Sequence, residues 1–245
     1  MDRFEFANPD VFRQDRKGVP EVILADSKTV EQSIAIARAF LEAKKRAILS
    51  RVGADLEQRL REEFPMEHDP AQPDQAWMEW YGDARAAVVR LAGGEPARTG
   101  GRVGILTAGT SDIPVAAEAA LICQEMGCHV VRVYDVGVAG LHRLFEPLRH
   151  MLGEVDVDCI IVAAGMDGAL PSVVAGLVDV PVVGLPTSIG YGFGGGGVGA
   201  LTSMLQTCSP GLAAVNIDNG VGAGAMAAII ANRVASARRQ GGDRA

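Results

Sequence analysis

The chain has few cysteines, and their spacing excludes two common uses of this residue. Cys123, Cys128, Cys159 and Cys208 are the four present, with no CxxC pair and no histidine cluster beside them. Neither a disulfide framework nor a structural zinc site is therefore predicted, and no metal ligand is assigned. Cys123, Cys128 and Cys159 lie in apolar helix or strand segments, so we interpret them as core residues.

An excess of positive charge and long apolar runs are also missing. Lys and Arg number 23 against 30 Asp and Glu, which gives a formal net charge of -7 and argues against general affinity for nucleic acid or anionic membranes. No run of about 18 apolar residues is free of charge and of glycine or proline. The first residues lack a basic segment followed by an apolar stretch. We expect a soluble cytoplasmic protein that binds substrate phosphates through local donors.

A change of composition near residue 95 predicts two domains. Hydrophobic residues make up 48% of the 245-residue chain, enough for a sizeable core. Most aromatic residues precede this point, and residues 93–101 have the composition of a linker. We predict a small α/β domain at residues 1–95 and a second domain at residues 101–245.

The first domain is expected to combine two short strands with helices. Strands are predicted at residues 21–25 and 47–52, and Thr29 precedes a helix with a periodic apolar run. A second helix is predicted at residues 54–63. We interpret residues 77–91 as a helical arm that leads to the linker.

One pattern recurs five times in the second domain. A short apolar strand is followed by a polar or glycine-rich turn and an apolar helix, with strands predicted at residues 102–106, 129–133, 159–163, 181–185 and 212–217. This alternation requires a parallel sheet with crossover helices on both faces. Ligands of such sheets bind beyond the carboxyl ends of the strands, so the five turns form the predicted site.

The turn at residues 109–114 suits a phosphate group. Thr110, Ser111 and the neighbouring amides offer donors at a predicted helix start. The same turn also fits an ordinary capped helix with Pro114 in its first turn, and the sequence favours neither interpretation. The glycine run at residues 192–199 lacks a P-loop lysine and GxGxxG spacing, so we interpret it as a lid or hinge.

His142 and Asp167 are two further candidates within these turns. Arg143 follows His142, and Asp167 stands between Gly165 and Gly168. Their position at predicted strand ends favours a role at the site. The ordinary interpretation of His142 and Arg143 is a solvated pair on a helix face. The ordinary interpretation of Asp167 is a residue that stabilises its own turn.

Four segments resemble the pyridinium-3,5-biscarboxylic acid mononucleotide synthase (LarB) family. They cover residues 104–116, 134–144, 162–177 and 215–224 and include the Thr-Ser-Asp turn and the His-Arg pair. The resemblance extends over nearly all of residues 101–235 and, more loosely, over residues 22–52. The second domain is also similar to the PurE carboxylase and mutase fold. This implies a PurE-like three-layer αβα domain with five parallel strands, preceded by the small α/β domain.

The resemblance implies carboxylation of the pyridinium ring of nicotinic acid adenine dinucleotide, with CO2 or bicarbonate as co-substrate. Hydrolysis of the phosphoanhydride then releases AMP and gives the biscarboxylic acid mononucleotide used in nickel-pincer cofactor synthesis. No tightly bound cofactor is expected. Mg2+ can accompany the dinucleotide phosphates, because the net charge of the chain is unfavourable to a dinucleotide.

The family likeness also implies roles for individual residues. Cys208, in Thr-Cys-Ser-Pro-Gly, matches the nucleophile. Asp167 stands where the family typically has Glu, so a role as a base or in orienting the substrate is expected from a side chain that is one methylene shorter. His142 is the third expected catalytic residue. The expected substrate-binding residues are Thr110, Ser111, Asp112, Asp135, Gly137, Arg143, Gly165, Met166, Ser188, Gly190, Tyr191, Asp218 and Asn219.

Cys208 is predicted between a helix and the following strand, at the sheet edge opposite the other turns. Either the glycine-rich segment folds back, or a neighbouring subunit supplies part of the site. The resemblance to PurE proteins, which are oligomers with shared sites, favours the second solution and suggests an octamer. Two other functions stay open: a PurE-type aminoimidazole ribonucleotide carboxylase or mutase that needs no thiol, and a non-enzymatic nucleotide-binding regulatory protein.

Overall fold

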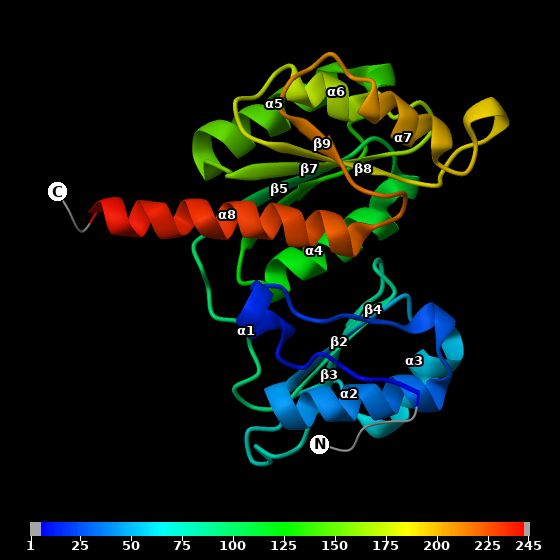
Figure 1. Ribbon diagram of the computed structural model, residues 1–245, viewed down its shortest axis with the longest axis vertical. Helices are drawn as coiled ribbons and strands as arrows, with labels where there is room; N and C mark the ends of the chain where they lie inside the picture. The colour runs from blue at the N-terminus through cyan, green and yellow to red at the C-terminus, as the bar shows by residue number, and fades with distance from the viewer. Residues whose placement is uncertain (1–5, 243–245) are drawn as a thin grey trace. The chain divides into compact units, whose positions relative to one another are not determined.

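The chain divides between Pro96 and Ala97, inside the glycine-rich segment between the two predicted domains. The computed structural model describes residues 6–242. It groups the chain into two units, Met1–Pro96 and Ala97–Ala245. Each unit has its own sheet and its own hydrophobic core, so each is described by itself (Figure 1).

The first unit contains the predicted helix that follows Thr29. The Thr29 hydroxyl accepts from the Gln32 amide at 3.2 Å, and the Gln32 side chain accepts from the Thr29 amide at 3.1 Å. This reciprocal cap satisfies amides that have no partner within a helix. The elements of the unit are α1 Arg13–Lys17, β1 Ile23–Leu24, a 3-10 turn Ala25–Ser27, α2 Val30–Lys44, β2 Arg46–Ser50, α3 Ala54–Glu63, β3 Trp77–Tyr81 and β4 Ala86–Arg90.

A four-stranded sheet in the order β1-β2-β4-β3 forms the centre of the first unit. β1 pairs parallel with β2, and the other two pairings are antiparallel. Leu49 of β2 and Val89 of β4 are completely buried in its core. The same core contains the periodic apolar residues of α2, namely Ile34, Ile36, Ala37, Phe40 and Leu41.

The helical arm predicted at residues 77–91 is wrong, because this segment is a β-hairpin. Trp77 of β3 lies opposite Arg90 of β4, and the two strands pair antiparallel along their length. The turn between them closes with a hydrogen bond of 3.0 Å from the Arg85 amide to the Gly82 carbonyl. Aromatic and β-branched residues pack well on a pleated surface, and β3 has two Trp and one Tyr while β4 has two Val.

The second unit alternates strands and helices as the sequence predicts. The last strand is shorter than predicted and ends at Ala214, because the chain then turns so that the Asp218 amide donates to the Pro186 carbonyl at 2.9 Å. The elements are β5 Arg102–Thr107, a 3-10 turn Thr110–Asp112, α4 Ile113–Glu125, β6 His129–Val133, a 3-10 turn Val138–Gly140, α5 His142–His150, a π-helical turn Met151–Val155, β7 Cys159–Ala164, α6 Leu170–Ala175, β8 Val182–Pro186, a 3-10 turn Gly192–Gly194, α7 Val198–Leu205, β9 Leu212–Ala214 and α8 Gly220–Gly242.

All five strands of the second sheet are parallel, in the order β6-β5-β7-β8-β9. Figure 1 shows α5, α6 and α7 on one face and α4 and α8 on the other. Leu144 of α5, Leu170 of α6 and Met204 of α7 enter the core on the first face. The predicted three-layer α/β fold is thus confirmed, and it brings the carboxyl ends of all five strands to one edge.

α8 is a helix of the second unit that is long and apolar enough to cross a membrane by length and composition. It packs closely on α4, since a Cβ added at Gly224 would stand 2.5 Å from the Ala119 carbonyl oxygen. Ala223, Ala227 and Ala231 of α8 are completely buried. One side of α8 therefore belongs to the core of a folded domain.

Candidate active site

Hydrogen bonds connect the turns that follow the parallel strands. These contacts join the ends of strands that lie side by side in the sheet, so they hold the carboxyl edge together as one structure. Examples are the hydrogen bonds from the Asp135 amide to Thr107 Oγ1 at 3.0 Å, from the Met166 amide to the Ile189 carbonyl at 2.8 Å, and from the Ser188 amide to Asp218 Oδ1 at 2.8 Å.

Asp112 is a buried carboxylate at this edge, with 3% of its surface exposed. Its Oδ1 accepts from the Thr187 hydroxyl at 2.6 Å and its Oδ2 from the Gly109 amide at 2.8 Å. Burial raises the pKa of Asp112 above its usual value, against the opposing effect of these hydrogen bonds. Asp112 thus ties its own turn to the one after β8. Thr187 is not among the site residues expected from the sequence, although it is a polar residue directly after a buried strand.

Thr110 and Ser111 present exposed side chains at the start of α4. Their turn continues into a 13-residue helix with Pro114 in its first turn. Exposed hydroxyls and the first amides of a helix are suitable donors for a phosphate group. The structure places both predicted residues where a ligand at the carboxyl edge can reach them.

Arg143 forms an ion pair with Asp135 across the turn that follows β6. Arg143 Nη1 donates to Asp135 Oδ2 at 2.8 Å, and both side chains are partly exposed. Asp135 has φ +60°, a strained conformation for a residue other than glycine. The guanidinium is held at the site edge and keeps donors free for a carboxylate or phosphate. His142, the first residue of α5, is exposed beside Arg143 in the sequence.

Asp167 is exposed, and a backbone hydrogen bond rather than its carboxylate closes the turn in which it lies. The turn closes through the Gly168 amide, which donates to the Gly165 carbonyl at 2.9 Å. Gly168 has φ +59°, and an added Cβ would stand 2.6 Å from the Ala200 Cα. Among the described residues no hydrogen bond to the Asp167 carboxylate is found, so the backbone and Gly168 account for the turn.

Gly137, Gly165 and Gly190 let the turns approach one another closely. A Cβ at Gly165 would stand 2.1 Å from the Ile189 carbonyl oxygen, and one at Gly137 would stand 2.6 Å from that of Ala108. A Cβ at Gly190 would meet the Met166 amide nitrogen at 3.3 Å. Gly165 and Gly137 therefore shape the site by allowing backbone contact.

Two of the predicted binding residues lie in the turn before α8. The Asp218 carboxylate accepts from the Ser188 amide, and Asp218 has φ +53°. Asn219 Oδ1 accepts from the Gly222 amide at 2.8 Å and so caps the first turn of α8. Asn219 thus has a structural function in this chain.

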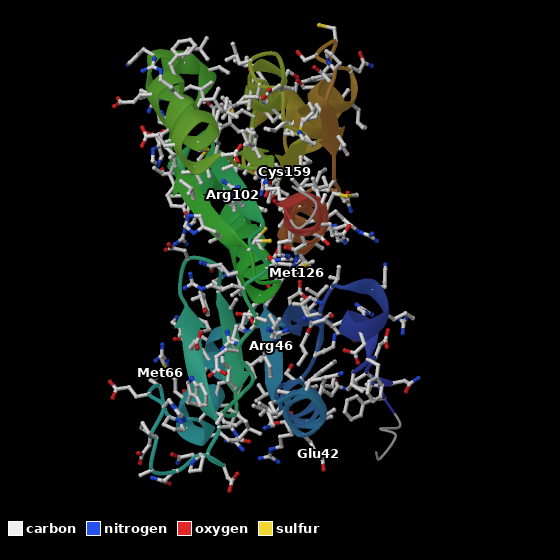
Figure 2. The ribbon with its side chains drawn as sticks, turned by 90° about the vertical axis from the view of Figure 1, so that its left-hand side faces the viewer. Glu42, Arg46, Met66, Arg102, Met126 and Cys159 are labelled. Atoms are coloured by element: carbon white, nitrogen blue, oxygen red, sulfur yellow. The ribbon has the colours of Figure 1, made fainter. Side chains whose placement is uncertain are left out.

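The four cysteines fall into two groups. Cys123, Cys128 and Cys159 are buried, which confirms their interpretation as core residues. Cys159 begins β7 beside Arg102 at the start of β5 (Figure 2). Burial raises the pKa of Cys128 to about 11 and that of Cys159 to about 12. Cys208 is exposed, so it is the thiol that can meet a ligand.

Cys208 lies at the opposite edge of the sheet from Asp167. It stands between α7 and β9, just before Gly211, whose carbonyl accepts from the Val182 amide where β8 begins. β8 runs the full depth of the sheet, which at about 3.3 Å per residue separates the two edges by roughly 16 Å. One chain therefore does not bring Cys208 to Asp167, as the order of elements predicts.

The two units match two family models. Residues 1–90 match the LarB/PurE-like N-terminal domain, and residues 102–241 match AIR carboxylase. The chain belongs to the LarB family. Its second domain is PurE-like, which agrees with the parallel five-stranded sheet.

Similar proteins come from archaea and bacteria. An uncharacterized protein of Methanocaldococcus jannaschii is 43% identical over 225 residues, which cover 91% of this chain and 82% of that protein. The N5-carboxyaminoimidazole ribonucleotide mutase of Thermotoga maritima is 34% identical over 136 residues, 53% of this chain and 74% of that protein. A crystal structure of a Treponema denticola PurE protein is 18% identical with a TM-score of 0.42, over 58% of this chain and 94% of that one. Family membership supports an enzyme of the carboxylase and mutase type.

Proposed function

We propose that this LarB-family protein carboxylates the pyridinium ring of nicotinic acid adenine dinucleotide and then releases AMP. The observation that carries the proposal is the exposed Cys208 in a chain whose other three cysteines are buried. A PurE-type reaction needs no thiol, whereas a pyridinium ring needs a nucleophile before it can react with CO2. An exposed thiol in a family of carboxylase type therefore favours this substrate.

The thiol is needed because a cationic pyridinium is electron-poor and does not attack CO2. When the Cys208 thiolate adds to the para carbon, the ring becomes a neutral dihydropyridine with a nucleophilic meta carbon. That carbon bonds to CO2, loses its proton to a base, and the ring then expels the thiolate. The ring regains its charge and the cysteine returns to its starting form, so no oxidant or reductant is consumed.

The carboxyl edge supplies groups for the other steps. Asp167 is the proposed base for the ring proton, because its carboxylate is exposed and is not used to hold its own turn. Thr110 and Ser111 are proposed to donate to the diphosphate, and Arg143 to a carboxylate. His142, exposed beside Arg143, is a further proposed proton donor or acceptor.

The site is proposed to be shared between two copies of this chain. Cys208 and Asp167 lie at opposite edges of one sheet, so Cys208 of one copy must act on a ring held by the carboxyl edge of another. Closed oligomers with shared sites satisfy this requirement, and an octamer is the expected assembly.

Co-expression of two inactive variants tests the shared site. Cys208→Ser and Asp167→Asn should each be inactive alone, and random mixing should leave about a quarter of the sites with both residues intact. The mixed oligomer is therefore expected to regain about a quarter of wild-type turnover. A mixture as inactive as its components would contradict the shared site.

The choice of substrate is tested by mass spectrometry of the products. Nicotinic acid adenine dinucleotide with bicarbonate should yield AMP and a dicarboxylated mononucleotide, with yield dependent on bicarbonate. The mutase similarity makes aminoimidazole ribonucleotide and its N5-carboxy form the comparison substrates. Conversion of these alone would establish the PurE-type alternative, and binding without any conversion would indicate a regulatory protein.

No tightly bound cofactor is proposed. Among the described residues no group of three or more His, Cys, Asp or Glu is arranged to hold a metal ion. Mg2+ is proposed only as a counterion bound to the diphosphate of the substrate. Acidic residues of the carboxyl edge repel the negatively charged diphosphate, and the cation reduces this repulsion. The reaction takes soluble metabolites, so the cytoplasm is the expected location.

A further inference from the structure

The segment after β8 carries two aromatic rings into solvent. Tyr191 is 83% exposed and Phe193 is completely exposed. Residues 190–197, which we call the glycine flap, otherwise consist of glycine. Figure 1 shows this yellow segment standing away from the rest of its domain. When a binding partner covers large apolar side chains in such a position, the removal of their surface from water is energetically favourable.

Both ends of the glycine flap are fixed at the carboxyl edge. Before it, the Met166 amide donates to the Ile189 carbonyl at 2.8 Å. At its other end, Gly197, the last residue of the flap, packs so tightly that an added Cβ would stand 2.6 Å from Ile217 Cγ2 and 2.9 Å from the Thr187 carbonyl oxygen. The flap therefore begins and ends among the turns that carry the proposed substrate groups.

Two glycines inside the flap, Gly192 and Gly196, are not explained by packing. Gly192 and Gly196 have φ +77° and +70°, and a Cβ added at either would find no heavy atom within 4 Å. Glycine there serves the backbone conformation and its freedom to change, because no neighbour excludes a side chain. A segment of this kind can move its two rings as a lid.

We infer that Phe193, two positions after Tyr191 in the glycine flap, stacks on a planar nitrogen heterocycle of the substrate when the flap closes over the carboxyl edge. This inference rests on the proposed function, which supplies a dinucleotide with two such rings, adenine and pyridinium. An aromatic face binds adenine by stacking and binds the cationic pyridinium by a cation-π interaction as well. Phe193 is thus a substrate-binding residue that determines preference for nucleotides with a flat ring.

Protection from chymotrypsin tests this inference without requiring turnover. The protease cleaves after exposed aromatic residues, so the free protein should be cut after Tyr191 and Phe193. Cleavage is measured with NAD, AMP and nicotinic acid mononucleotide, and peptides are identified by mass spectrometry. Protection by NAD and AMP identifies adenine as the stacked ring, and protection by NAD and the mononucleotide identifies pyridinium. Cleavage after Phe12, which is 61% exposed, is the internal control and should not change.

Variants of Phe193 give a second measurement. Phe193→Ala should raise the KM for the dinucleotide about tenfold to a hundredfold with little change in kcat, the usual effect of losing one stacking partner. Phe193→Tyr and Phe193→Trp keep a flat ring and should restore the KM.

Three results would overturn the inference. One is the absence of protection by all three ligands, and another is a wild-type KM for Phe193→Ala. The third is a change of oligomeric state in Phe193→Ala during sedimentation, which would make a second copy of the chain the partner of the ring. Dinucleotide turnover, measured separately in the wild type, distinguishes these results from failure of the proposed function.

Discussion

The Thr187 hydroxyl donates a hydrogen bond of 2.6 Å to Asp112 Oδ1, inside the second unit and away from solvent. The two residues follow different strands and are 75 positions apart in the sequence. Together they fix the turn that presents Thr110 and Ser111. This contact positions the proposed phosphate donors although neither Thr187 nor Asp112 offers an exposed group.

Thr187→Val should destabilise the protein, because it leaves a buried carboxylate oxygen without its donor. The expected loss is about 1–3 kcal/mol in the free energy of unfolding, the usual cost of an unsatisfied buried acceptor. Urea unfolding measures it. Thr187→Ser keeps the hydroxyl and serves as the matched control, so equal losses for both variants would contradict the role of the hydrogen bond.

The raised pKa of Asp112 predicts that the free energy of unfolding depends on pH. The folded protein holds a proton on Asp112 at pH values where the unfolded chain, with a pKa near 3.8, has lost it. The contribution of Asp112 to stability is therefore most favourable below that unfolded value and falls as the pH rises through the folded pKa. Asp112→Asn has no such titration, so its free energy of unfolding should rise relative to wild type over this window. A difference that stays constant with pH would contradict the assignment.

Much of the fold could be predicted because local patterns agree with it. The cap at Thr29, the α3 range and the five parallel strands all follow from residue types and periodicity. The hairpin at residues 77–90 was mispredicted because β4 is buried on both faces and shows no alternation of polar and apolar residues. Burial on both faces comes from tertiary packing, which local sequence does not reveal.

The site was predictable to the level of its turns but not of its contacts. A parallel sheet requires the turns after β5 and β8 to share one edge, and this places their residues together. The pairing of Thr187 with Asp112 depends on sheet order and register, in which β7 separates β5 from β8. Neither follows from residue spacing, so Thr187 was not predicted.

Asp167→Asn should abolish most activity while leaving the fold unchanged. The substitution removes the proposed base, and the usual loss is about a hundredfold or more in rate. The turn should persist, because the Gly168 amide and Gly165 carbonyl hold it. Gly168→Ala is the contrasting variant, since its Cβ would collide with Ala200 and lower the thermal midpoint. Near-normal turnover by Asp167→Asn would show that its charge is not used.

Ser111→Ala should weaken binding of the dinucleotide. The hydroxyl is exposed at the start of α4 and is proposed to donate to a phosphate, so the KM should rise about tenfold. Calorimetry with AMP measures the same contact without turnover. Thr187→Ser, a change at a buried residue that supports the turn, is the control and should leave the affinity for AMP unchanged. An unchanged affinity would make the turn an ordinary helix start.

Selective alkylation should distinguish Cys208 from the other cysteines. Iodoacetamide reacts with the thiolate, and the raised pKa values of Cys128 and Cys159, about 11 and about 12, keep these groups protonated near neutral pH. Burial also raises the pKa of Cys123. Intact-mass measurement of the folded protein should show a single adduct, which Cys208→Ser removes, and unfolding should expose all four thiols. If the dinucleotide binds at Cys208, its analogue NAD should slow this labelling. Labelling of a second cysteine in the folded protein would show that Cys208 is not the one reactive thiol, and would contradict the basis for proposing it as the nucleophile.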